Sequence, residues 1–271
     1  LVPAGYGSAV LVDVQALEEN PVLRQAASLE DFGFQGLLPL GAAGLLQGLG
    51  LAFDEKGEGT ITLLDGAGDV ESLLQLAGGF GLPLGGPTSE PYRDHEVWHI
   101  DVFGLTLAIG QADATTVVMS SGSPQGGASA LDLVKGSLDS FDGLAPRLLD
   151  DPATESLLNS LPSGFAATLL SRCHDLEELA SVIDLPGCAR AAISADVLAD
   201  DRVVVHGLVS FETPELAAAA LETTIERIEA GAELPFGEVG VGQLGNLVWT
   251  RVLVDPEQVA QTLQALLVPK Q

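Results

Sequence analysis

Apolar and polar residues alternate in several short runs along the chain, and turn-forming residues separate these runs. In residues 49–66, LGLAFDEKGEGTITLLDG, two apolar runs flank a charged, glycine-rich turn. Alternation with a period of two indicates strands with one buried face, and two such runs around a turn are typical of a β-hairpin. Residues 190–211, RAAISADVLADDRVVVHGLVSF, have the same layout and predict a second hairpin.

A helical pattern follows each predicted hairpin. The first helix covers roughly residues 69–77, DVESLLQLA, and the second begins at Thr213 in TPELAAAALETTIERIEAG. The second has a threonine N-cap, a proline at the first helical position, acidic residues in its first turn and a glycine after its end. A strand that carries a tryptophan comes after each helix.

The two halves of the chain repeat this order of elements. Residues 2–13, VPAGYGSAVLVD, match residues 161–172, LPSGFAATLLSR, in the placement of proline, glycine and an aromatic residue. VWHIDV at 97–102 and VWTRVLV at 248–254 contain the only two tryptophans of the chain. The repetition predicts an internal duplication.

The predicted fold is therefore α+β, with two similar halves that are ferredoxin-like or related αβ sandwiches. Residues 1–118 form the first repeat and residues 161–271 the second. A connecting segment, residues 119–160, carries helix signals of its own in ALDLVKGSL and DPATESLLNSL.

The chain is strongly acidic, and this limits its partners. Its formal net charge is −27, and it contains only three lysines. Such a charge repels phosphate backbones and anionic membranes, so we exclude nucleic acid binding and do not expect direct membrane contact. It favours solubility, divalent or basic partners, or high salt.

One long stretch, residues 32–53, contains no charged residue, and it ends in an alternating strand pattern. Its glycines, glutamines and proline favour a buried loop, a short helix and a strand over a membrane span. The alternative is an apolar surface that faces lipid or a partner protein. The candidate partner-facing residues are Leu37, Leu38, Leu45 and Leu46.

The only two cysteines, Cys173 and Cys188, lie close together in the sequence. A disulfide here closes a short loop and is worth roughly 3 kcal/mol on a chain-entropy model. We predict this bridge, which implies an oxidising compartment. The alternative is a pair of inert, buried thiols.

Residues 95–99, HEVWH, satisfy the pattern H-E-x-x-H, which on a helix is a zinc site with a general base. The preceding Pro91 and the surrounding β-favouring residues predict a strand instead. On a strand, His95 and His99 share a face roughly 13 Å apart, which is too far for one zinc ion. We predict exposed strand histidines. Catalytic zinc on His95, Glu96 and His99 and adventitious metal binding are the alternatives.

Residues 54–65, DEKGEGTITLLD, resemble a calcium-binding EF-hand loop. Asp54, Glu58 and Asp65 fall at ligand positions 1, 5 and 12 of such a loop. Lys56, however, places a cation at a ligand position. We predict a hairpin turn here and regard calcium binding as the alternative. No catalytic residue and no cofactor site is predicted anywhere in the chain.

The opening of the chain resembles a bacterial domain family of unknown function that is typical of secreted proteins and lipoproteins. The matching residues are Val2, Pro3, Ala4, Asp13, Asn20, Pro21 and Leu23. Residues 37–53 and 148–162 are similar to middle segments of that family. The resemblance implies an extracytoplasmic location and brings no catalytic residues.

These observations predict a non-enzymatic extracytoplasmic protein that is a binding or assembly subunit of a cell-envelope complex with a protein partner. Any membrane attachment is expected through a leader or lipid anchor outside this chain. One alternative is a zinc-dependent hydrolase that uses residues 95–99. Another is a small-ligand or lipid carrier with its site in a cleft between the halves.

Overall fold

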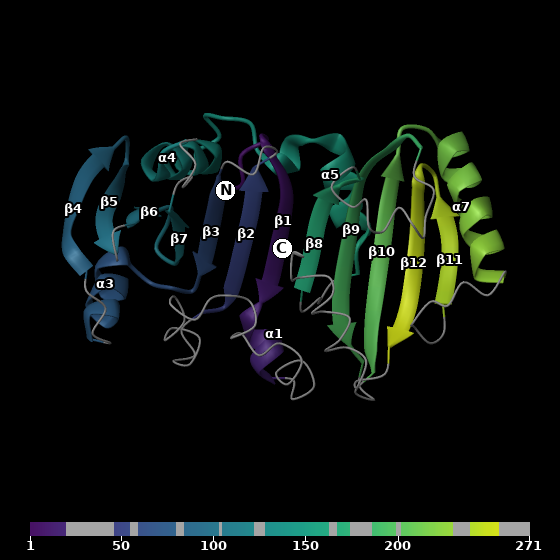
Figure 1. The fold of residues 1–271 in the computed structure, drawn as a ribbon, viewed down its shortest axis with the longest axis horizontal. Helices are drawn as coiled ribbons and strands as arrows, with labels where there is room; N and C mark the ends of the chain where they lie inside the picture. Colours follow the sequence, from purple (N-terminus) through teal and green to yellow (C-terminus); the bar gives the residue numbers. More distant parts are fainter. Residues whose placement is uncertain are drawn as a thin grey trace. The chain divides into compact units, whose positions relative to one another are not determined.

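The computed structural model describes residues 1–19, 46–54, 59–79, 84–102, 105–121, 128–162, 167–173, 186–198, 202–229 and 239–254. These residues form an α+β fold of antiparallel strands with a few helices, as Figure 1 shows. The predicted α+β class is confirmed. The strands are β1 (Tyr6–Asp13), β2 (Gly48–Asp54), β3 (Thr60–Asp65), β4 (Leu84–Tyr92), β5 (His95–Val102), β6 (Leu105–Gln111), β7 (Thr116–Ser120), β8 (Ala167–Arg172), β9 (Cys188–Val197), β10 (Val203–Phe211), β11 (Val239–Leu244) and β12 (Leu247–Val254). The helices are α1 (Val14–Glu19), α3 (Val70–Gly79), α4 (Ala130–Phe141), the 3₁₀ helix η2 (Leu148–Asp150), α5 (Pro152–Ser160) and α7 (Pro214–Glu229).

The chain divides into two compact units. Unit 1 comprises residues 1–15 and 36–151, and unit 2 comprises residues 16–35 and 152–271. The division falls between η2 and α5. The segment expected to connect the two repeats therefore contributes α4 to unit 1 and α5 to unit 2.

The strand orders of the two units correspond in part. The order in unit 1 is β1-β2-β3-β7-β6-β5-β4, and the order in unit 2 is β8-β9-β10-β12-β11. They match if the β6–β7 hairpin is an addition to unit 1, and Trp98 on β5 then corresponds to Trp249 on β12. Neither order is the ferredoxin-like one that the sequence suggested. Successive strands β8, β9 and β10 are antiparallel neighbours, whereas split βαβ units contain parallel strands.

The local predictions from the sequence are confirmed. β2 pairs with β3 and β9 with β10 as antiparallel hairpins. The helix α7 begins at Pro214, and the Thr213 hydroxyl accepts a hydrogen bond from the Leu216 amide at 3.3 Å. At the start of α3, the Asp69 carboxylate accepts one from the Ser72 amide at 2.7 Å. Both caps satisfy amide groups that the first helical turn leaves without a partner.

Each unit has its own apolar core. In unit 1, α4 packs on β6 and β7, and its Val134 and Leu138 are fully buried. Gly110 on β6 permits this close approach, because a Cβ atom there would lie 2.7 Å from Val134 Cγ1. In unit 2, α7 packs on β10, β11 and β12, and Phe211 lies in its core. No helix among the described residues is long and apolar enough to cross a membrane.

Candidate functional site

The residues of the H-E-x-x-H pattern lie on strand β5, not on a helix. The zinc-hydrolase alternative required a helix over residues 93–103, so the strand overturns it. Alternation places His95, Val97 and His99 on one face, and Val97 is paired with Gly110, against which α4 packs. The prediction of a strand is thus confirmed. The prediction that both histidines are exposed is wrong for His95, whose side chain is only 9% exposed beneath the end of α4.

His95 joins β5 to two other elements. Its Nδ1 lies 2.9 Å from the carbonyl oxygen of Gln111, and its Nε2 lies 3.0 Å from Oδ2 of Asp142, the C-cap of α4. The ring thereby bridges β5 to the end of β6 and to the end of α4. Both nitrogens are occupied by the protein itself, and His95 has a structural role.

The neighbouring polar groups of unit 1 also pair with one another. Lys135 of α4 donates to Glu90 of β4 at 2.7 Å, and its ammonium lies 5.0 Å from the ring centroid of Tyr92. The bond from Lys135 is the largest cause that lowers the pKa of Glu90. Tyr92 in turn donates to Asp139 at 3.0 Å. These contacts attach the β4–β5 hairpin to α4.

We expect His95→Ala to lower the free energy of unfolding of unit 1 by about 1–3 kcal/mol, because the fold loses a largely buried ring and its two hydrogen bonds to Gln111 and Asp142. Glu96→Ala is the matched control, since Glu96 is exposed and should change stability by less than about 0.5 kcal/mol. Urea unfolding, followed by Trp98 fluorescence in a Trp249→Phe background, measures both. Equal stability of the two variants would remove the structural role of His95.

The calcium-loop candidates lie only partly in the described region. Glu58 falls outside it, as does the side chain of Asp54. Asp65 is exposed at the end of β3, and its Oδ1 accepts a hydrogen bond from the Gly66 amide at 3.0 Å. Within the described residues, no group of three or more His, Cys, Asp or Glu side chains is arranged to hold a metal ion.

The candidate partner-facing leucines are also divided. Leu37, Leu38 and Leu45 lie outside the described residues. Leu46 is only 4% exposed, so its side chain packs inside unit 1 and does not face a partner. This corrects the expectation for Leu46.

The predicted bridge between Cys173 and Cys188 is confirmed, with the two Cα atoms 5.9 Å apart. Cys173 follows β8, and Cys188 begins β9. Cys173 is buried in the core cluster that also contains Phe211 and Ala217, and Cys188 packs against that cluster. The alternative of two free thiols is therefore wrong.

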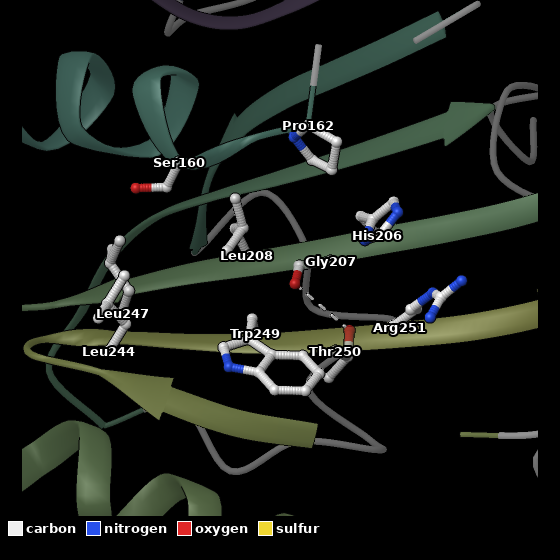
Figure 2. Close-up of a pocket in the computed structure, with 10 residues that line it drawn as sticks. All are labelled: Ser160, Pro162, His206, Gly207, Leu208, Leu244, Leu247, Trp249, Thr250 and Arg251. Carbon is white, nitrogen blue, oxygen red and sulfur yellow. Dashed lines mark hydrogen bonds between the residues drawn. The ribbon is translucent and has the colours of Figure 1, made fainter. Parts of the chain in front are cut away.

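A pocket of about 300 Å³ lies on one face of the unit 2 sheet, as Figure 2 shows. Leu208 and Leu247 are buried in it, whereas Leu244 and Trp249 are 66% and 38% exposed. Pro162, just after α5, adds a further apolar side chain. Exposed apolar side chains around a hollow are typical of ligand sites.

The register of the strands explains why these side chains gather. Trp249 on β12 pairs with Leu208 on β10, so the two side chains share a face. The alternate residues Val209 and Phe211 point to the opposite face, into the core with α7. The side chain of Trp249 is thus on the face that α7 does not cover.

Trp249 lies close over a strand that has glycines at alternate positions. Trp249 pairs with Gly242 of β11, where a Cβ atom would lie 2.6 Å from indole Cε2 and Cζ2. A Cβ at Gly240 would lie 3.6 Å from indole Cζ3. The two glycines therefore leave room for the indole over β11, and the ring forms one wall of the pocket.

The pocket has a polar end and an apolar end. Figure 2 shows His206 and Arg251 at one end, Leu244 and Leu247 at the other, and Trp249 between them. His206 and Arg251 pair across β10 and β12. Burial lowers the pKa of His206 below 6.5, and the positive charge of Arg251 lowers it further, whereas Asp196 on β9 opposes both.

The lowered pKa of His206 predicts a pH dependence of stability. Between the folded pKa and 6.5, the unfolded chain binds more protons than the folded one, so His206 makes the fold less stable as pH falls through this window. The stability of the wild type relative to His206→Gln should therefore decrease from about pH 7.5 to about pH 5.5. Urea titrations at both pH values measure this difference. A difference that stays constant or increases at low pH would contradict the prediction.

Sequence reasoning missed this pocket. It used Trp249 only as a mark of the repeat. The available signal was Gly240-Val241-Gly242, a pair of glycines at strand spacing a few residues before a tryptophan in a hairpin. Such glycines are typical of places where a neighbouring group approaches the backbone closely.

Comparisons with known proteins identify the fold. No protein-family model matches the sequence, and no curated protein matches it. Crystal form III of TP0453 is similar over 98% of both chains, with a TM-score of 0.58 and 9% identity. Crystal form IV gives 0.58 and 10% identity over 97% of this chain and 96% of that one, and crystal form I gives 0.59 and 9% identity over 98% of both. At this identity, the chain is similar to TP0453 in its fold.

Proposed function

We propose that the protein is a non-enzymatic, extracytoplasmic binding protein whose ligand site is the pocket of unit 2. The observation that carries this proposal is the wall formed by Trp249 over Gly242, with Leu208 and Leu247 beside it. A volume of about 300 Å³ is at the lower end of the range for small-molecule sites. The ligand is accordingly small. The site lies inside unit 2, in contrast to the cleft between the halves that the sequence suggested.

The extracytoplasmic location is supported by the disulfide between Cys173 and Cys188. Disulfides persist in oxidising compartments and are rare in the cytosol. The net charge of −27 is compatible with a soluble protein in such a compartment. A non-enzymatic role agrees with His95, the most deeply buried of the candidate catalytic side chains, being held by Gln111 and Asp142.

Native mass spectrometry of freshly purified protein tests the binding role. We expect a small, non-covalent mass on the wild type that is lost in Trp249→Ala and kept in Trp98→Ala. Trp98 is the matched control, because it lies on the corresponding strand of unit 1. Loss of the ligand in both variants, or a wild-type protein that carries no ligand, would contradict the proposal.

A second candidate role, as a subunit that assembles with a protein partner, is favoured by exposed apolar side chains in unit 1. Phe141, Leu144 and Leu149 are 38%, 59% and 49% exposed between the end of α4 and η2. A photo-crosslinking residue at position 144 should then form a discrete adduct in intact cells. The same residue at position 226, on the exposed side of α7, should form none. Equal labelling from both positions would count against this role.

A further inference from the structure

We propose that the pocket of unit 2 selects an organic anion, and that Arg251 binds the anionic group while Trp249 holds the apolar body of the ligand. This inference rests on the proposed function, because it names the chemical class of the ligand for the same pocket. The division of the pocket into an apolar and a cationic end carries it (Figure 2).

The two ends of the pocket follow from neighbouring rows of side chains across the sheet. One row is apolar and runs from Leu170 on β8 through Ala192 and Leu208 to Trp249 on β12. The register places these residues on one face, with Gly242 of β11 as the last member. The rings or chains of a ligand can therefore stack on Trp249 without meeting a polar group in this row.

The adjacent row is polar. It runs from Thr168 on β8 through Ser194 and His206 to Arg251. Thr168 and Ser194 are each 1% exposed, and their hydroxyl oxygens have no hydrogen-bond partner among the described residues. Buried hydroxyls without a partner are uncommon in folded proteins. Both hydroxyls lie outside the pocket lining, so His206 and Arg251 are the members of this row that line the pocket beside the apolar row.

Arg251 is placed to accept an external anion. Its side chain is exposed, and it forms no ion pair with any described residue. Gly240, its partner in the register on β11, has no side chain that could cover it. Guanidinium groups bind carboxylates, sulfonates and phosphates with paired hydrogen bonds and stay charged at all physiological pH values.

The charged groups that face His206 are Arg251 and Asp196. The carboxylate of Asp196 accepts a hydrogen bond from the amide of Val197 at 2.7 Å.

The negative net charge of the chain makes the position of Arg251 in the pocket informative about the ligand. A chain with a net charge of −27 repels anions at long range. An anion that nevertheless prefers this pocket must gain its affinity from a nearby cation, and Arg251 is the cation that lines the pocket. The volume of about 300 Å³ suits one or two rings or a short chain and not a lipid with two acyl chains.

Two fluorescent probes with the same skeleton test the proposal. The anionic probe is 1-anilinonaphthalene-8-sulfonate, and the uncharged probe is N-phenyl-1-naphthylamine, which lacks the sulfonate. Energy transfer from Trp249, measured in a Trp98→Phe background, reports a probe bound near Trp249, because no other tryptophan remains, and the Gly242→Ala variant then shows whether that probe lies in this pocket. The titrations use the whole chain at about 0.15 M salt, where long-range repulsion is screened.

We expect Arg251→Gln to weaken the affinity for the anionic probe about tenfold and to change that for the uncharged probe by less than about twofold. Arg147→Gln is the matched control, because it changes the net charge equally at an exposed site in unit 1. Gly242→Ala should weaken both probes, since its Cβ displaces the indole.

The outcomes separate the inference from the function on which it rests. If Arg251→Gln weakens neither probe, or both equally, the selection of anions is overturned while binding in the pocket stands. If neither probe receives energy from Trp249, the pocket itself is overturned as a ligand site. If Arg147→Gln weakens the anionic probe as much as Arg251→Gln does, the effect is one of net charge and the role of Arg251 is overturned.

Discussion

Replacement of Phe211 by alanine is expected to lower the free energy of unfolding of unit 2 by about 3–5 kcal/mol. Phe211 is 1% exposed and is the largest of the fully buried side chains among the described residues. Its ring lies in one cluster with Ala217 and Ala220 of α7 and with Val248 of β12. Removal of the ring leaves a cavity that a helix and two strands cannot fill by small movements.

The variant isolates the ring, because the backbone contacts of Phe211 do not depend on it. The amide of Phe211 donates to the carbonyl of Asn246 at 2.9 Å, and the Asn246 side chain donates to the carbonyl of Phe211 at 2.9 Å. Urea unfolding, followed by Trp249 fluorescence in a Trp98→Phe background, measures the loss. Phe141→Ala in unit 1, followed by Trp98 fluorescence in a Trp249→Phe background, is the control, since Phe141 is 38% exposed and should cost much less. Similar losses in the two variants would contradict the assignment of Phe211 to the core.

Sequence reasoning predicted the elements that depend on local signals. The hairpins β2–β3 and β9–β10 arise from alternation around polar turns, and α7 begins where Thr213 and Pro214 predicted. The strand at β5 followed from its β-favouring residues, in spite of the H-E-x-x-H pattern. In each case the physical cause lies within about twenty residues of sequence.

The order of the strands was not predictable in the same way. Unit 1 places β6 and β7 between β3 and β5, and this order is set by the pairing of β3 with β7, two strands that lie far apart in the sequence. The burial of His95 has a similar origin, because its partner Asp142 belongs to a helix 47 residues away. A strand pattern alone indicates which residues share a face but not what packs on that face.

The pocket needed the same long-range information. Leu208 and Trp249 meet only because β10 and β12 are neighbours in one particular register. A shift of one residue would turn Trp249 into the core and Val248 to the pocket face. The one local signal for the pocket in the sequence is the pair of glycines Gly240 and Gly242 on β11, which leave space for the indole. The function of this surface therefore depends on pairings that the sequence does not display.

The second large expected effect is the loss of stability of unit 2 when its disulfide is opened. Opening the Cys173–Cys188 bridge should lower the free energy of unfolding of unit 2 by about 3 kcal/mol, because the bridge closes a loop with a sequence separation of 15 residues. In the register of β9 and β10, Cys188 pairs with Phe211. The bridge and the aromatic ring thus stabilise the same part of the core. Their losses are not expected to be additive, because neighbouring residues share their contacts.

Urea unfolding with and without a thiol reductant measures the contribution of the bridge. Wild-type unit 2 should be less stable by about 3 kcal/mol under reducing conditions. The double variant Cys173→Ala/Cys188→Ala should be equally stable in both conditions, since it has no bridge to open. Alkylation followed by mass spectrometry confirms that the wild type is fully reduced. If full reduction leaves the wild type unchanged, the bridge does not stabilise unit 2, and the need for an oxidising compartment loses its physical basis.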